Sequence, residues 1–451
     1  MAPVDLAPLA LFRIAFGLLM LYEVGRYTDP GSKGDWVNRY YVEPQLFFPY
    51  VGFEWVQPWS QGGMYLLFAA LGILAVFIAL GLLYRVSALL FFLAFTHVFL
   101  IDQSNYLNHF YLISLISFVM IFLPAHREYS LDCIFRPRLS TSVAPSWTLW
   151  LLRIQIGIPY FYGGIAKLNS DWLQGEPMRD WLHARTSFPL IGQYFTDERM
   201  VYSFVYGGTL LDLLVVPMLL WKKTRAFALI AAFFFHICNH MLFNLGIFPW
   251  FMLVATLIYL EPSTIRKIFF FGSGDPRDKL KTTPLLPDLA HLPRWTFGLL
   301  AIYLVLQLGL PFRHWLYPGN VSWTEEGHNF SWRMKLRTKH IRRPRFLITD
   351  PDSKRQWEID PRDYLTKRQS RKMPRRPDMI LHFAHWLEKK WELDGYPDVE
   401  VRARVSASLN GRRHQNLVDP KVDLTTKERG LGRTDWILPL TEPLFVTEEE
   451  S

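Results

Sequence analysis

Long apolar runs separated by short polar segments fill the first two thirds of the chain, and the last third is polar throughout. A run of about 17–25 mostly apolar residues is long enough to cross a bilayer as a helix. We therefore predict a polytopic α-helical membrane protein with about nine transmembrane helices. Their expected ranges are 6–24, 64–83, 86–102, 107–123, 147–166, 201–221, 225–243, 246–260 and 295–312.

The polar last third follows a different period. Residues 398–405 alternate strictly between polar and apolar, and Asn410-Gly411 follows them as a hairpin signal. A helix is expected over 379–387, directly after Pro377-Asp378. The sequence thus predicts a transmembrane helical domain over 1–312 and a soluble, strand-rich domain over 313–451.

The short loops indicate the orientation, because lysine and arginine collect in cytoplasmic loops. If the N-terminus is cytoplasmic, the inner loops carry most of them: Arg85, Arg127, Arg136, Arg138, Lys222, Lys223, Arg225, Arg266, Lys267, Arg277, Lys279, Lys281 and Arg294. The outer loops carry fewer: Arg26, Lys33, Arg39, Arg179, Arg185 and Arg199. An odd number of spans then places the C-terminal domain outside the cytoplasm, and one miscounted span would reverse that conclusion.

The formal net charge of +9 is shared between the membrane part and the tail. We attribute it to topology and to contact with membrane lipids, since no nucleic-acid recognition motif accompanies it. The sequence has no Cys/His spacing typical of zinc, no P-loop and no dinucleotide fingerprint, so we expect neither a metal nor nucleic acid as a ligand. Cys133 lies in a predicted inner loop and Cys238 inside a helix, so no disulfide is expected between them.

Lys167 is the most informative polar residue, because it ends an apolar, helix-length run that also contains Tyr160. A charged amine is costly at that place, so burial favours its neutral, basic form. Lys167 is therefore a candidate catalytic base. The alternative is a lysine that only marks a helix end and extends its amine to the membrane surface.

Few other polar residues lie inside or at the ends of the predicted spans. A polar side chain there is energetically costly unless it has a polar partner or a functional role. Asn108 and His109 begin one span, and His236 and Asn239 lie late in another. With a cytoplasmic N-terminus, His109, Asn239 and Lys167 all come to the outer face. The alternatives are that Asn108 only caps its helix and that His236 only packs between helices.

The soluble domain would lie on that same outer face. Its opening run, residues 323–334, contains His328, Trp332, Arg333 and Met334 and could cover the mouth of a pocket there. A lipid-accessible pocket roofed by a soluble domain suits a reaction with one apolar and one polar partner.

The chain resembles the vitamin K-dependent gamma-glutamyl carboxylases and their bacterial homologues, the proteins with a horizontally transferred transmembrane (HTTM) domain. The similarity runs in order along nearly the whole chain. It is carried by residues 11–20, Tyr84-Arg85, Asn108-His109, Lys167-Leu168, Asp171-Trp172, the stretch from His236 to Pro249, Ser331-Trp332 and residues 419–423.

The resemblance implies an enzyme that oxidises vitamin K hydroquinone with oxygen and carboxylates peptide glutamate. The amine matching Lys167 is implied to deprotonate the hydroquinone. Oxygen addition then gives a strong base that removes a gamma-proton, carbon dioxide captures the carbanion, and the quinone leaves as its epoxide. Asn108 and His109 are implied beside Lys167, with His109 supporting proton transfer at the glutamate. The remaining candidates for binding the quinone or the glutamate are Tyr160, His236, Asn239, His328, Trp332, Arg333 and Met334.

Two positions depart from the animal enzymes: Arg333 replaces an acidic residue and His328 an aromatic phenol. They concern glutamate recognition more than quinone chemistry, so a quinone epoxidase without carboxylation and a non-catalytic membrane scaffold remain alternatives. The expected setting is the bacterial cytoplasmic membrane, with the C-terminal domain outside. The expected co-substrates are a hydroquinone of the menaquinol type, oxygen and carbon dioxide, and the expected partners are membrane lipids and a glutamate-containing peptide or protein.

Overall fold

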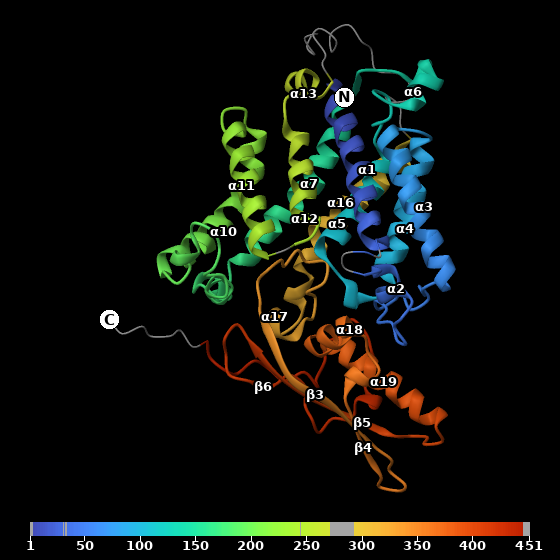
Figure 1. Ribbon diagram of the computed structural model, residues 1–451, viewed down its shortest axis with the longest axis vertical. Coiled ribbons are helices and arrows are strands. Elements are labelled where there is room, and N and C mark those ends of the chain that lie inside the picture. The colour runs from blue at the N-terminus through green and yellow to red at the C-terminus, as the bar shows by residue number, and fades with distance from the viewer. Residues whose placement is uncertain (1–2, 30, 32–33, 244, 271–292, 445–451) are drawn as a thin grey trace.

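The computed structural model describes residues 3–29, 31, 34–243, 245–270 and 293–444. Figure 1 shows a helical body followed by a smaller domain that contains strands. In chain order the first part contains β1 (Pro3–Asp5), α1 (Ala7–Thr28), α2 (Trp36–Tyr41), α3 (Gln61–Leu80), α4 (Tyr84–Leu100), α5 (Asn108–Phe122), α6 (Leu131–Phe135), β2 (Val143–Pro145), α7 (Ser146–Lys167), α8 (Ser170–Leu173) and α9 (Met178–His183). It continues with α10 (Glu198–Leu220), α11 (Arg225–Phe243), α12 (Phe248–Thr256), α13 (Pro262–Phe269), α16 (Arg294–Gly309) and α17 (Val321–Thr324).

The C-terminal domain contains β3 (Lys339–Thr349), β4 (Gln356–Ile359), α18 (Lys367–Lys372), α19 (Pro377–Leu393), β5 (Glu400–Leu409) and β6 (Gln415–Asn416). Its strands form one four-stranded sheet in the order β4-β3-β5-β6, with all neighbours antiparallel. The alternation over 398–405 predicted β5, and the apolar run over 379–387 lies inside α19. Asn410 and Gly411 both adopt left-handed backbone conformations where the chain turns from β5 toward β6.

All nine predicted spans coincide with helical segments. Among the described residues, five helices are long and apolar enough to cross a membrane: α1, α3, α10, α11 and the stretch Trp295–Leu316. A sixth candidate is the pair Phe248–Tyr259 and Pro262–Phe269, which is bent by 120°. α4 and α5 are shorter apolar helices, and α7 carries Arg153, Gln155 and Lys167. The prediction of a helical membrane body with a strand-containing C-terminal domain is confirmed, although fewer than nine helices meet the criteria of length and composition.

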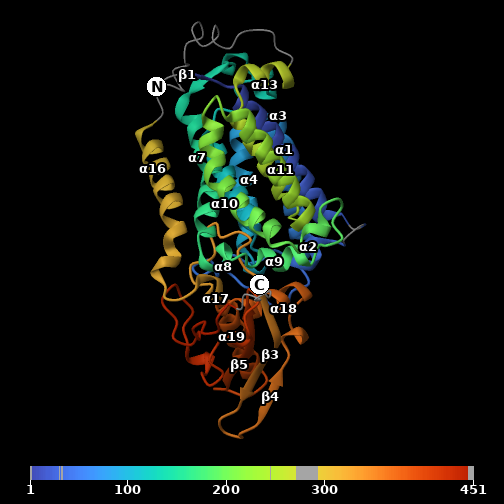
Figure 2. The same ribbon diagram turned by 90° about the vertical axis from the view of Figure 1, so that its left-hand side faces the viewer.

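The N-terminus and the C-terminal domain lie at opposite ends of the helical body (Figures 1 and 2). α6 and α13, which carry or adjoin several of the basic residues expected on the inner side, lie at the N-terminal end. This arrangement agrees with an odd number of crossings. Lys33, Arg277, Lys279 and Lys281 also entered the orientation argument, but they lie outside the described residues.

The C-terminal domain is bound to the helical body by buried polar contacts and by shared apolar packing. Leu46 and Phe48, from the loop after α2, belong to the hydrophobic core of the C-terminal domain. Arg412, after β5, donates two hydrogen bonds to the carboxylate of Asp171 in α8, at 2.6 and 2.7 Å. Asn410 donates a third, at 2.9 Å. Asp171 therefore holds the hairpin of the sheet against the end of α7, where Lys167 lies.

Candidate functional site

A cavity of about 360 Å³ lies among α7, α10, α11 and α12, and Met334 and Lys335 from the segment before β3 also line it. Most of its lining is apolar, and aromatic rings from several elements contribute to it: Tyr160, Trp172, Phe204, Phe235 and Phe248. Such a lining suits a flat, apolar ligand with few polar atoms.

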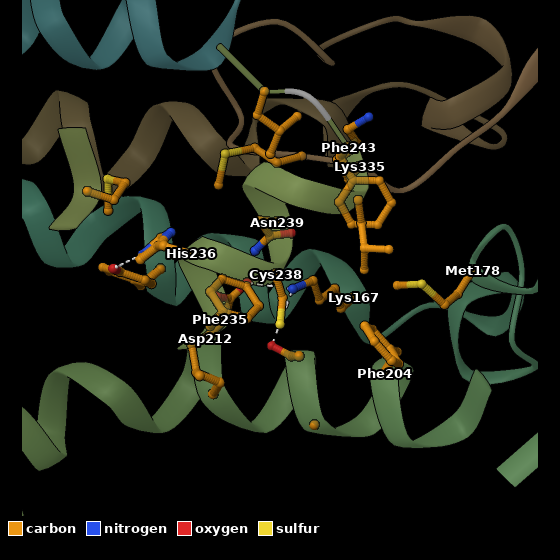
Figure 3. A pocket seen from close by; sticks show the side chains of 18 of the residues that line it. Lys167, Met178, Phe204, Asp212, Phe235, His236, Cys238, Asn239, Phe243 and Lys335 are labelled. Carbon is orange, nitrogen blue, oxygen red and sulfur yellow. Dashed lines mark hydrogen bonds and ion pairs between the residues drawn. The ribbon is translucent and has the colours of Figure 1, made fainter. Parts of the chain in front are cut away.

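Lys167 ends α7 and points into this cavity, as Figure 3 shows. Its side chain is almost fully buried, and its Nζ lies 2.6 Å from Oδ2 of Asp212 on α10. The amine also donates to the carbonyl oxygen of Gly208 at 3.3 Å. The rings of Trp172 and Phe235 lie 5.4 and 5.7 Å from Nζ, within range of a cation–π attraction. The amine therefore has one buried counter-charge and one backbone acceptor, and aromatic rings lie beside it.

Three glycines allow α7 and α10 to approach closely enough for this pair. A Cβ added to Gly164 would lie 2.7 Å from the side chain of Leu213, and one added to Gly163 would lie 3.3 Å from Oδ2 of Asp212. On α10, a Cβ at Gly208 would lie 3.7 Å from Nζ of Lys167. Larger residues at Gly163 or Gly164 would push the helices apart and lengthen the Lys167–Asp212 contact.

A second polar pair lies deeper in the cavity wall. The hydroxyl of Tyr160 on α7 lies 2.6 Å from Nε2 of His236 on α11, and Nδ1 of His236 is buried without a hydrogen-bond partner among the described residues. Asn239, one turn further along α11, also points into the cavity (Figure 3). These groups provide donors and acceptors in an otherwise apolar site, which is the arrangement that fixes the orientation of a polar ring substituent.

The cavity opens between α10 and α11 toward an exposed, apolar surface of the helical body. Phe234 and Cys238 on α11 and Gly207 on α10 all line the cavity and are exposed on the outer surface of the helical body. Other large apolar side chains of the same two helices are exposed beside them, including Leu210, Leu214, Phe227 and Ile230. A ligand dissolved in the bilayer would therefore reach Lys167 from the side.

The segment before β3 places neighbouring residues in two different cavities. Met334 and Lys335 line the apolar cavity, whereas Arg333 lines a separate cavity of about 520 Å³ on the other side of the end of α7. This second cavity is more polar and is also lined by His314 and Asn169. Burial lowers the pKa of Arg333 to about 10, with a further contribution from the charge of Arg337. Nε of Arg333 is buried without a hydrogen-bond partner among the described residues.

The structure brings together only part of the residue set expected from the sequence. Lys167, Tyr160, His236, Asn239 and Met334 share the apolar cavity. Four other expected residues do not line this cavity: Asn108, His328, Trp332 and Arg333. His109 lies just behind the cavity wall.

The ring of His109 stacks on Phe248, with ring centroids 5.7 Å apart, and Phe248 separates it from the cavity. Asn108 accepts a hydrogen bond from the hydroxyl of Tyr106 at 2.9 Å. Asn108 is the first residue of α5, not its cap, since the capping position is Leu107 and no side chain caps the helix.

Trp332 packs in the core against Tyr111, with ring centroids 5.0 Å apart. Nδ1 of His328 lies 2.8 Å from a guanidinium nitrogen of Arg337. Burial lowers the pKa of His328 well below its usual value, and the charges of neighbouring arginines add to this shift. His328 therefore belongs to the junction between the helical body and the C-terminal domain.

Asp212 is the site residue that the sequence-based reasoning missed. It is the one charged residue of α10 after Arg199, a position within an apolar span that a carboxylate rarely occupies without a partner or a role. That placement was a usable signal. No group of three or more His, Cys, Asp or Glu residues that could hold a metal ion occurs in the part of the chain that the structure describes.

Comparison with known protein families gives two matches that together cover most of the chain. The model of the HTTM domain matches residues 1–263, and the model of the vitamin K-dependent gamma-carboxylase lumenal domain matches residues 292–443. The chain belongs to the vitamin K-dependent gamma-carboxylase family. No solved structure matches it.

Membership in this family identifies the chain as a multi-pass membrane protein with a lumenal-type C-terminal domain. The apolar cavity lies within the HTTM match, apart from Met334 and Lys335, which lie within the lumenal-domain match. Both parts of this carboxylase-family chain therefore contribute to the surroundings of Lys167.

Proposed function

We propose that this chain oxidises a hydroquinone of the vitamin K type to its epoxide, with Lys167 as the base. The observation that carries the proposal is the placement of Lys167. Its amine is buried, has Asp212 as its one carboxylate partner among the described residues, and faces an aromatic cavity that opens on the exposed apolar surface of α10 and α11. A base that must act away from water needs these surroundings.

The residues of the cavity fit such a substrate. Trp172, Phe204 and Phe235 offer flat apolar surfaces for a naphthoquinone ring, and the opening between α10 and α11 suits an isoprenoid tail that stays in the bilayer. Tyr160, His236 and Asn239 are the groups that would orient the ring oxygens. When bound, the hydroquinone would supply all four electrons that reduce O2, so that one oxygen atom enters the epoxide and the other leaves as water.

Asp212 gives Lys167 a way to act as a base although the two form an ion pair. In a dry site, an ammonium–carboxylate pair is close in energy to the neutral amine and carboxylic acid, because both charges lose their hydration. A proton moved from Nζ of Lys167 to Oδ2 of Asp212 leaves a neutral amine 2.6 Å away. That amine then accepts the proton of the substrate hydroxyl, and the pair as a whole gains one proton.

We further propose that a peptide glutamate is carboxylated next to this site, with its side chain in the polar cavity. Arg333 lines that cavity, and its Nε is buried without a hydrogen-bond partner among the described residues. Guanidinium groups bind carboxylates well. Ala166 lines the polar cavity and Lys167 the apolar one, so the end of α7 separates the two.

A quinone epoxidase without carboxylation is the second candidate, and one observation favours it. His109, the residue expected to support the glutamate step, lies behind Phe248 and does not line the cavity of Lys167. Carboxylation would then require another proton-transfer group or a movement of Phe248. The proposed setting of either activity is a bacterial cytoplasmic membrane, with the C-terminal domain on the outer side.

One assay distinguishes these functions. The purified protein receives reduced vitamin K, oxygen, labelled bicarbonate and a glutamate-containing peptide, and both the epoxide and the fixed label are measured. Epoxide with label supports the carboxylase, and epoxide without label supports the epoxidase. If neither product exceeds that of a Lys167→Ala variant, the proposed chemistry is wrong and the chain is a scaffold.

A further inference from the structure

Basic side chains gather at the junction between the helical body and the C-terminal domain. We call the following five residues the junction cluster: Arg337, Lys339, Lys372, Arg375 and Arg376. Arg337 precedes β3 and Lys339 begins it, and Lys372 ends α18. Arg375 and Arg376 come from the 3₁₀ turn Met373–Arg375 and the residue after it. Both views of the fold place α18 between the sheet and the ends of the helices (Figures 1 and 2).

The cluster has more positive charge than its surroundings neutralise. Glu325 pairs with Arg337 at 2.6 Å and with Lys339 at 2.9 Å, so both oxygens of this carboxylate already have a cation partner. Among the described residues, no carboxylate lies within ion-pair distance of Lys372, Arg375 or Arg376.

Lys372, Arg375 and Arg376 either contact neutral groups or have polar atoms without a hydrogen-bond partner among the described residues. Arg376 donates to the carbonyl oxygen of Gln103 at 2.6 Å, and Nε of Arg375 is buried without a hydrogen-bond partner among the described residues. Lys372 lacks any hydrogen bond or ion pair to the described part of the chain. Burial lowers the pKa of Lys372 to about 7, and the charges of Arg376, Arg368 and Arg375 lower it further. Partly buried cations without counter-charges are costly, so the arrangement favours a bound anion.

The position of the cluster indicates where that anion comes from. α18 packs against the end of the helical body that faces the C-terminal domain. The guanidinium of Arg368 lies 4.8 Å from the ring centroid of Tyr40 in α2, and Gln369 donates to Asp102 at 2.9 Å. α2 contains Trp36 and two tyrosines, and such residues are enriched at the level of lipid headgroups. Lys367 and Arg371, on the same short helix, lie at the surface and extend the basic patch.

We propose that the junction cluster binds the headgroup of an anionic phospholipid from the outer leaflet. Polybasic segments next to membrane-spanning helices attract such lipids. Lys372 and Arg375 are half-buried, so a phosphate can reach them from the side while its acyl chains remain in the bilayer. The lipid would neutralise the surplus charge and hold the C-terminal domain against the helical body. The site does not depend on the proposed enzymatic activity.

The test measures stabilisation by lipid of the full-length protein in detergent. A ligand that binds only the folded state raises its unfolding temperature. Phosphatidylglycerol should raise the unfolding temperature of the wild type, whereas phosphatidylcholine should not. Each basic residue at a lipid surface contributes about fivefold to binding, so Lys372→Gln/Arg375→Gln should weaken the apparent affinity for phosphatidylglycerol roughly 25-fold.

Two matched variants make the result specific. Arg342→Gln/Lys354→Gln removes the same charge from exposed positions on β3 and the loop after it and should keep the response to phosphatidylglycerol. Lys372→Arg/Arg375→Lys keeps the charge of the cluster and should also respond. Without lipid, the Gln variant should unfold no earlier than the wild type, because it loses a repulsion.

The proposal is overturned if the Gln variant and the wild type respond equally to phosphatidylglycerol. It is also overturned if inorganic phosphate alone stabilises the wild type as much, which would indicate a free-anion site. Stabilisation by a poly-glutamate peptide but not by phosphatidylglycerol would assign the cluster to an acidic peptide instead.

Discussion

Lys167 and its partner Asp212 decide whether the apolar cavity can contain a base. Arginine retains the positive charge but does not lose its proton at working pH. We therefore expect Lys167→Arg to lower hydroquinone oxidation by about 10²–10⁴-fold while the protein still folds. Epoxide formation and thermal unfolding are measured together. Lys335→Arg is the control, because Lys335 lines the same cavity but is exposed and far less enclosed. Normal activity in Lys167→Arg would show that Lys167 is not the base and only ends its helix.

Asp212 should be needed for Lys167 to act as a base. Asp212→Asn keeps the size of the side chain but cannot take the proton of the Lys167 amine, so epoxide formation should fall by about 10²–10⁴-fold. Epoxide formation and thermal unfolding are measured together. A normal rate in Asp212→Asn would show that Asp212 only supports the packing of α10.

His109 and Lys167 should affect the two proposed products differently. If His109 serves the glutamate step, His109→Ala should lower carboxylation by about 10²–10⁴-fold and leave most of the epoxide formation, whereas Lys167→Ala should abolish both. The measurement is the ratio of fixed label to epoxide. A ratio that stays constant in His109→Ala would mean that His109 acts only through its stacking on Phe248.

At the scale of helices, the spacing between α10 and α11 sets the room for the substrate. A Cβ at Gly208 would lie 3.7 Å from Nζ of Lys167 and 3.9 Å from the ring of Phe235. Gly208→Leu should therefore fill the cavity and raise KM for the hydroquinone by about tenfold or more, the effect of roughly 1.4 kcal/mol of lost binding. Gly298→Leu on α16 is the control, because a Cβ there meets nothing within 4 Å. Equal KM values in the two variants would place the substrate elsewhere.

At the scale of the whole molecule, the orientation in the membrane can be measured directly. Asn410 is unsuitable for labelling, because it is buried and bonded to Asp171. Leu393 in the C-terminal domain is 89% exposed. Lys223 lies in the turn that follows α10, at the end of that helix away from the C-terminal domain. After Cys133 and Cys238 are replaced, an impermeant thiol reagent applied from outside should label Leu393→Cys and not Lys223→Cys. The reverse pattern would contradict a cytoplasmic N-terminus.

Much of the architecture could be predicted from the sequence, because the signals are local. Apolar runs of helical length indicated the helical segments of the membrane body, and a strict two-residue alternation indicated β5. The position of Lys167 at the end of such a run also marked it as a candidate base. Side chains on one face recur about every 3.6 residues in a helix and every second residue in a strand. The order of apolar residues therefore predicts which element forms and which of its faces is buried.

Only the tertiary structure decided which of these residues meet. Asp212 reaches Lys167 from another helix because Gly163 and Gly164 allow a close approach, and Phe248 lies between His109 and the cavity. Arg333 and Met334 are neighbours in sequence yet line different cavities. The periodicity of one segment carries no information about the distance to another. That distance depends on how side chains of different size pack where the helices cross.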